Sequence, residues 1–171
     1  MEKLYSKIVG TPVFEDDLPQ PLTSVKDVVM DPERGKVVAL VVNVNKKEVL
    51  APYDIIKWND VIRIMSRENI TPSEDIIRVN EVMKSGIEIM ANSVVTEDGE
   101  RLGKVFDYTV NPNTFDLRKI YCAKSLLGMF RYDSRIIPVK KIVEVLEDRI
   151  VVKNDTKVKQ EVKAVSGEMA Y

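Results

Sequence analysis

The sequence contains no histidine and only one cysteine, and both facts restrict its chemistry. Histidine is the commonest general base near neutral pH and the commonest ligand of transition metals. Without it, a serine or cysteine nucleophile has no imidazole partner, so a histidine-based catalytic triad is excluded. The lone Cys122 lies in an apolar run and has no second cysteine to pair with, so we expect a buried small side chain. We therefore predict no catalytic residue, no metal site and no cofactor, in a protein that is not an enzyme.

Long apolar runs are absent as well. No stretch approaches the roughly 18 uninterrupted apolar residues of a membrane span, and no apolar signal segment follows Met1. Charge of one sign is not in excess, because 26 basic and 27 acidic residues give a formal net charge of −1. That balance creates no strong field toward nucleic acid or anionic lipid. These features predict a cytoplasmic protein.

The basic residues that do cluster lie in the second half of the chain, and they are Arg118, Lys119, Arg131, Arg135, Lys140 and Lys141. No aromatic residues arranged to stack bases accompany them. A solvated face is therefore favoured over a nucleic-acid-binding stripe.

What the sequence does contain is an internal repeat with an offset of roughly 80 residues. Residues recur in the same order: Val13, Glu15 and Asp16 as Val95, Glu97 and Asp98; Leu22, Val25, Asp27 and Pro32 as Leu102, Val105, Asp107 and Pro112; Pro52 and Ile56 as Pro138 and Ile142. The repeat indicates one small fold built twice.

Valine and isoleucine number 41 and leucine only 10, a bias toward side chains that fit a β-sheet. Turn residues delimit strands at 9–14, 24–30, 37–44, 48–52 and 61–66, and again at 93–96, 104–110, 117–124, 135–139 and 149–153. Such short, evenly spaced strands predict a mainly β chain of two small barrels, closed or nearly closed.

Between the copies the pattern changes to that of a helix. Thr71 is the expected N-cap, Glu74 completes a capping box, and Ser85-Gly86 ends a helix from Pro72 to about Lys84. The predicted organisation is repeat 1 at 1–68, a helical linker at 69–86, repeat 2 at 87–154 and a charged tail at 155–171. Whether the tail orders on a partner stays open.

Two stretches of the second copy carry a family resemblance: Leu102-Gly103-Lys104-Val105-Phe106-Asp107-Tyr108 and Arg135-Ile136-Ile137-Pro138. Together with the final Ile-Val-Val strand, they resemble the PRC-barrel, a small β-barrel used as an adaptor in unrelated settings. In the first copy the signature is degraded, with Leu22-Thr23-Ser24-Val25-Lys26-Asp27 and Ala51-Pro52-Tyr53-Asp54 in these places.

The tandem arrangement is similar to that of short archaeal PRC-barrel proteins of the CdpB type. That resemblance implies a self-associating scaffold of FtsZ-based cell division that forms a dimer or polymer and binds a SepF-like membrane anchor. It also implies recruitment to the division site at the inner face of the membrane. The alternative is a role in ribosome or RNA maturation like that of RimM, which pairs one PRC-barrel with a different barrel.

The segment Ser125 to Tyr132 is the candidate interface. Where the first copy turns tightly at 45–47, the second inserts about six residues that are mostly apolar. Loop tips are normally polar, so an apolar tip predicts a contact. The candidate contact residues are Leu126, Leu127, Met129, Phe130 and Tyr132. The contact is with the other barrel, with another copy of the chain or with a partner. Equally, the segment folds down on its own barrel or against the linker helix.

Acidic residues offer weaker candidates. The turns 15–17 and 97–98 lack the ligand spacing of a calcium loop, so solvated hairpin tips are expected. Asp27 and Asp107 occupy equivalent points of separate barrels, so we expect them to stay apart and to bond backbone amides of their own copy.

Overall fold

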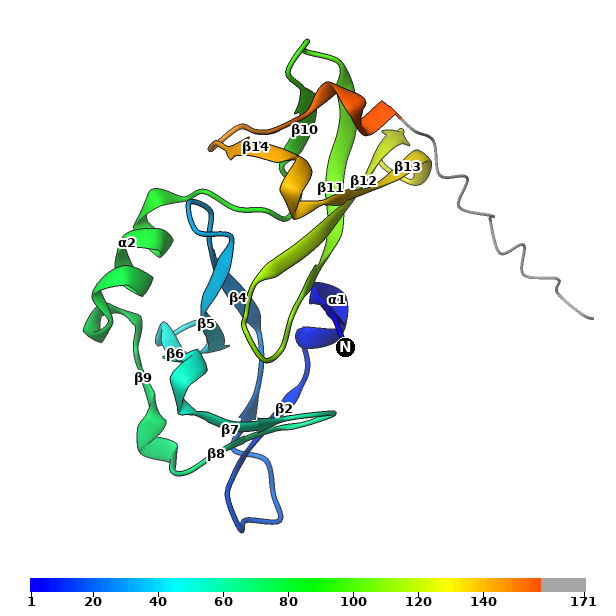
Figure 1. Cartoon of the computed structure of the whole chain (residues 1–171). Coiled ribbons are helices and arrows are strands. Elements are labelled where there is room, and N and C mark those ends of the chain that lie inside the picture. The colour runs from blue at the N-terminus through cyan, green and yellow to red at the C-terminus, as the bar shows by residue number, and fades with distance from the viewer. Residues whose placement is uncertain (158–171) are drawn as a thin grey trace, which may run out of the picture.

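The computed structural model describes residues 1–157, and this part of the chain is mainly β. The first half comprises β1 (Lys3–Leu4), α1 (Tyr5–Ile8), β2 (Pro12–Glu15), β3 (Thr23–Ser24), β4 (Asp27–Asp31), β5 (Lys36–Asn43), β6 (Glu48–Leu50), β7 (Ile55–Trp58), β8 (Ile62–Ile64) and β9 (Ile70–Pro72). After α2 (Ile77–Ser85) come β10 (Ser93–Thr96), β11 (Arg101–Val110), β12 (Leu117–Leu126), β13 (Phe130–Pro138), β14 (Ile142–Val145) and β15 (Arg149–Val152). Short 3-10 turns are η1 (Pro52–Asp54), η2 (Arg67–Asn69), η3 (Ser73–Asp75), η4 (Val139–Lys141) and η5 (Asn154–Lys157). The prediction of a mainly β chain with a short helix between its halves is confirmed (Figure 1).

The two halves repeat one strand arrangement. β2 pairs in parallel with β8, as β10 does with β15, and these late strands pair antiparallel with β7 and β14. The hairpins β4–β5 and β11–β12 are likewise equivalent. The sheets are not closed, so of the two expected forms, closed and nearly closed, the closed form is excluded. The turn η4 separates β13 from β14, and these two strands remain the ends of their sheet.

A single glycine explains why the second half forms one large sheet. In Gly103, φ is +112°, and a Cβ there would lie 2.1 Å from the carbonyl oxygen of Ala123. Only glycine allows this close approach, so β11 continues without a break and pairs with both β10 and β12. In the first half, the strand is interrupted between Ser24 and Asp27, and two four-stranded sheets result.

The structural alignment of the repeats differs from the sequence alignment by one residue in two places. Val13 lies opposite Ile62 and Val94 lies opposite Ile150, so Val13 corresponds to Val94 rather than to Val95. Pro52 opens η1, as Val139 rather than Pro138 opens η4. A shift by one residue exchanges the two faces of a strand, and Val13 and Val94 both point into the core. Matching identical residues between the two repeats could not determine this register.

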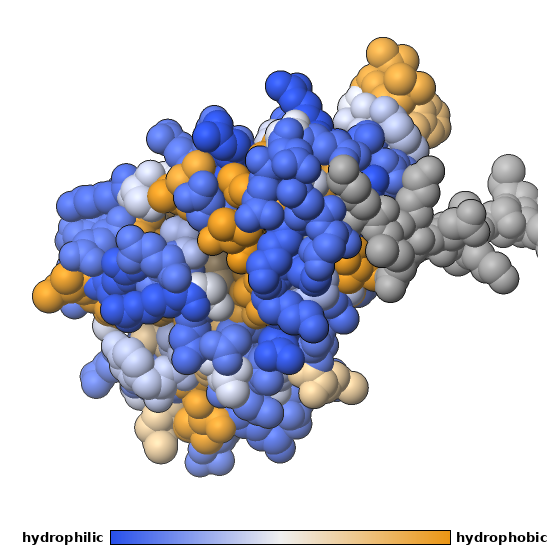
Figure 2. Space-filling view, turned by 45° about the horizontal axis from the view of Figure 1, so that its top comes forward, coloured by the Kyte–Doolittle hydropathy of each residue, from blue (hydrophilic) through white to orange (hydrophobic). Residues whose placement is uncertain are grey.

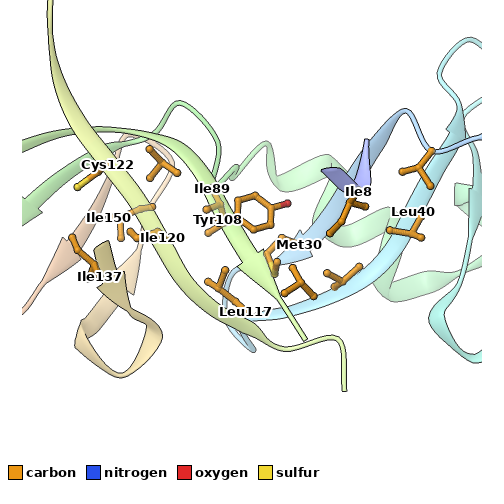
Figure 3. Close-up of a cluster of buried hydrophobic side chains, with 14 of the residues drawn as sticks. Ile8, Met30, Leu40, Ile89, Tyr108, Leu117, Ile120, Cys122, Ile137 and Ile150 are labelled. Carbon is orange, nitrogen blue, oxygen red and sulfur yellow. The ribbon is translucent and has the colours of Figure 1, made fainter. Parts of the chain in front are cut away.

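The two halves share a core. The face in Figure 2 is mostly hydrophilic, whereas Figure 3 shows buried apolar side chains continuing from Ile8 and Leu40, past Tyr108, to Ile120 and beyond. The hairpin tips are joined by backbone bonds from Val37 N–H to the Phe115 carbonyl and from Leu117 N–H to the Gly35 carbonyl, both 2.8 Å. Each half thus completes the hydrophobic core of the other, as small modules require.

The helix α2 begins later than predicted. Thr71 lies in β9 opposite Val49 and is not an N-cap, and the residue before the helix, Ile76, makes no side-chain cap. The end at Ser85-Gly86 is confirmed, with Gly86 in the left-handed conformation. The helix packs on the outer face of the first-half hairpin in a second apolar cluster of Val29, Ala39, Val41, Val49, Val79 and Val82. The capping signal was outweighed because β6 takes residues 70–72 as a strand partner.

The predicted ranges 1–68, 69–86 and 87–154 are not independent in space, because β1 pairs with β11 of the other half. Most of the predicted tail, 155–171, lies outside the described residues. Among residues 1–157, no helix combines the length and the apolar character that crossing a bilayer requires.

Candidate protein-interaction site

The segment Ser125 to Tyr132 extends the β12–β13 hairpin instead of forming a loop. Leu126 lies opposite Phe130, and Ser125 opposite Arg131, so the ladder continues almost to the tip. Leu127 and Gly128 close the turn, both with positive φ, and Met129 N–H donates to the Leu126 carbonyl at 3.1 Å. Positive φ at two successive residues suits the twist of a tight hairpin. The inserted residues therefore project as a β-hairpin.

The tip of this hairpin exposes its apolar side chains. The exposed fractions are 58% for Leu126, 82% for Leu127, 73% for Met129, 66% for Phe130 and 52% for Tyr132. Figure 2 shows an orange projection at the upper right, on the side where the β12–β13 hairpin ends in Figure 1. None of these side chains belongs to either of the buried apolar clusters formed within residues 1–157. A contiguous exposed apolar patch marks an interaction site in many proteins.

Ion pairs and a cation–π contact stabilise the base of the β12–β13 hairpin. Asp133 accepts from Lys124 at 3.2 Å and from Arg135 at 3.3 Å, and the guanidinium of Arg131 stacks 4.4 Å from the Phe106 ring. Burial alone would raise the pKa of Asp133, but the hydrogen bonds from Lys124 and Arg135 outweigh it and keep that pKa below its ordinary value. The carboxylate stays ionised, and the apolar tip stands on an ordered base.

The two equivalent aspartates both reach α1. The Tyr5 hydroxyl donates to Asp27 at 2.9 Å, and the Ser6 hydroxyl donates to Asp107 at 2.6 Å. Each aspartate also accepts from the backbone N–H of the next residue, as expected, at 2.7 and 2.9 Å. The two aspartates are linked through α1, which lies between the halves (Figure 1) and binds both. A four-residue helix leaves no periodic signal in the sequence.

This arrangement is structural. Burial, followed by the bond to Asp27, raises the pKa of Tyr5 to about 12, so its phenol stays protonated. A hollow of about 190 Å³ beside it is smaller than the ~300 Å³ of typical ligand sites.

A groove of about 930 Å³ follows the second sheet to the base of the β12–β13 hairpin. Its walls carry charges of both signs and include Lys104, Lys124, Tyr132, Glu144 and Arg149.

The other candidates have structural roles. Cys122 is buried, and desolvation raises the pKa of its thiol to about 11, so it is a poor nucleophile. In the acidic turns, the N–H groups of Asp16 and Glu97 bond the carbonyls of Ile64 and Val152. Across residues 1–157, no three acidic or cysteine side chains gather closely enough to hold a metal ion.

Several cations of the basic group are occupied. Lys119 binds Glu2 at 3.0 Å, Arg135 binds Asp133, and Lys141 binds Asp155. They are therefore less available to phosphates than the sequence alone suggested.

The comparisons with known proteins agree with the duplicated fold. The family model described as PRC-barrel domain matches the chain twice, at residues 1–82 and at residues 83–159. No curated protein sequence matches.

Proposed function

Because the chain belongs to the PRC-barrel family in both of its halves, we propose that it is a non-enzymatic scaffold that self-associates and binds other proteins. The observation that carries this proposal is the exposed apolar tip of the β12–β13 hairpin. Full burial of each large apolar side chain stabilises a complex by about 1.5–3 kcal/mol before the cost of ordering is subtracted. Four such side chains at one projecting tip favour association.

The inequality of the two halves bears on the form of the assembly. The β5–β6 hairpin of the first half ends at a short turn, whereas the equivalent β12–β13 hairpin of the second half carries the extension. A tip that binds a different surface of the next chain makes a heterologous contact, which continues into a polymer unless rotation closes a ring. Contact between two tips closes a dimer. Both forms satisfy the proposal.

The finer proposal is a role in FtsZ-based archaeal cell division, in which the chain binds a SepF-like membrane anchor and so reaches the division site. The tandem arrangement of two PRC-barrel domains supports it. A purified SepF-like protein should be retained by the immobilised full chain at near-physiological salt. Absence of retention, with the chain shown to be folded, counts against this role while leaving self-association intact.

The RimM-like alternative in RNA maturation has less support, because cations such as Lys119 and Lys141 already pair with acidic side chains. Co-sedimentation with ribosomal subunits that is lost steeply as salt rises would favour it over the scaffold.

A further inference from the structure

The first half of the chain covers the outer edge of its hairpin. β9 pairs antiparallel with β6, so that Ile70 lies opposite Leu50 and Thr71 opposite Val49. One residue further on, Ser73 N–H donates to the Lys47 carbonyl at 2.8 Å. In an antiparallel pair, the backbone N–H and C=O groups of every second residue point toward the partner strand, so those of Thr71, like those of Ser73, point toward β6. Pro72, which lies between Thr71 and Ser73, has no N–H to donate.

Within residues 1–157, no strand pairs with the equivalent edge of the second half. Leu50 pairs with Leu40 as Ile137 pairs with Ile120, so the three residues of β6 correspond to residues 135–137 of β13. β13 ends its sheet, and through residue 157 no strand lies on its outer side. An uncovered edge presents unpaired N–H and C=O groups and is a template for another strand.

The described chain ends where such a strand has to begin. In the first half, the Asn69 amide of η2 donates to Asp54 of η1 at 2.9 Å, and β9 follows directly. In the second half, Lys141 of η4 binds Asp155 of η5, and Lys153 N–H donates to the Lys141 carbonyl at 2.9 Å. Because η4 directly follows β13, η5 has the same place relative to β13 as η2 has relative to β6.

We propose that the segment beginning at Val158 docks on the outer edge of β13 of its own chain, as β9 docks on β6. The first-half register places Val158 opposite Ile137, Lys159 opposite Ile136 and Gln160 opposite Arg135. The 14 residues from 158 to 171 exceed the three that β9 uses, and none of them is a proline. Docking there closes the edge, so that contacts between chains fall to the hairpin tip rather than to β13.

A pair of proline variants of the full chain tests this register. Lys159 corresponds to Thr71, whose N–H faces β6, and Gln160 corresponds to Pro72. Lys159→Pro therefore removes a ladder hydrogen bond, whereas Gln160→Pro is the matched control. Hydrogen exchange at the Ile136 amide, which corresponds to Val49 and faces the docked segment, should be roughly tenfold faster in Lys159→Pro and unchanged in Gln160→Pro.

Protection of Ile136 in the unaltered chain should not depend on protein concentration. Equal exchange in all three proteins would overturn the proposal, and so would an equal effect of both prolines. Protection that grows with concentration would assign the edge to a second copy of the chain instead. None of these outcomes alters the expectation for the hairpin tip, which is tested separately by assembly mass.

Discussion

Replacing Leu126 and Phe130 with lysine at the hairpin tip tests the proposed self-association surface directly. Their exposed fractions are 58% and 66%. Full burial of such a side chain contributes about 1.5–3 kcal/mol, so scaling by exposure leaves about 2–4 kcal/mol for the pair. The double variant should therefore raise the apparent Kd of self-association roughly 30-fold to 700-fold. Light scattering across a concentration series measures this as a lower assembly mass at each concentration.

The fold should survive, because exposed side chains contribute little to stability, typically within about 0.5 kcal/mol. A matched control replaces Tyr53 and Ile56, two exposed apolar residues of the first half, with lysine. The control adds the same charge at another surface and should leave the mass curve unchanged. An unchanged mass curve for the tip variant would refute the role of the hairpin, and equal losses in both variants would indicate a general charge effect.

Two further predictions concern stability. Gly103→Ala places a Cβ 2.1 Å from the Ala123 carbonyl oxygen and should lower the free energy of unfolding by more than about 2 kcal/mol. Gly99→Ala, with open space around it, should lower the free energy of unfolding by about 1 kcal/mol. Equal losses of stability in denaturant unfolding would contradict the close-approach argument. The Arg78 guanidinium donates to the buried Asp31 carboxylate at 2.7 and 2.8 Å, and these bonds keep the Asp31 pKa below its ordinary 3.8. A depressed carboxylate pKa contributes stability that is present above the ordinary pKa and is lost as pH falls toward the folded-state value. Arg78→Met should therefore be less stable than the wild type at neutral pH, and its stability should fall less steeply below about pH 4. Thermal melts in which the stability of the variant falls with pH as steeply as that of the wild type would contradict this.

The repeat, the β character and the central helix could be predicted because they depend on local composition and on motif order. The beginning of α2 could not, because the capping pattern at Thr71 competes with the need of β6 for a strand partner, which is a contact between distant segments. β7 and β14 were missed because each is only four residues long, and in both the residues at the middle are exposed. The shared core depends on contacts such as Val37 with Phe115 that no local pattern encodes.

The sequence indicated the residues of the candidate site but not the shape of the segment that carries them. Apolar letters where a polar turn is expected identified Leu126 to Phe130, and the structure adds that they cap a projecting hairpin. The outer edge of β13, which no strand covers within residues 1–157, had no sequence signal. It is recognised only by comparison with β6, whose edge is covered by β9. The link from α1 to Asp27 and Asp107 was missed for a similar reason, since it joins segments about 20 and 100 residues apart.

Assembly mass of the unaltered full chain, followed by sedimentation velocity over a wide concentration range, tests the central claim most directly. The account predicts a mass above that of one chain that rises with concentration and falls when the hairpin tip carries lysines. A single-chain mass at every concentration would contradict the proposal that this duplicated PRC-barrel protein is a self-associating scaffold.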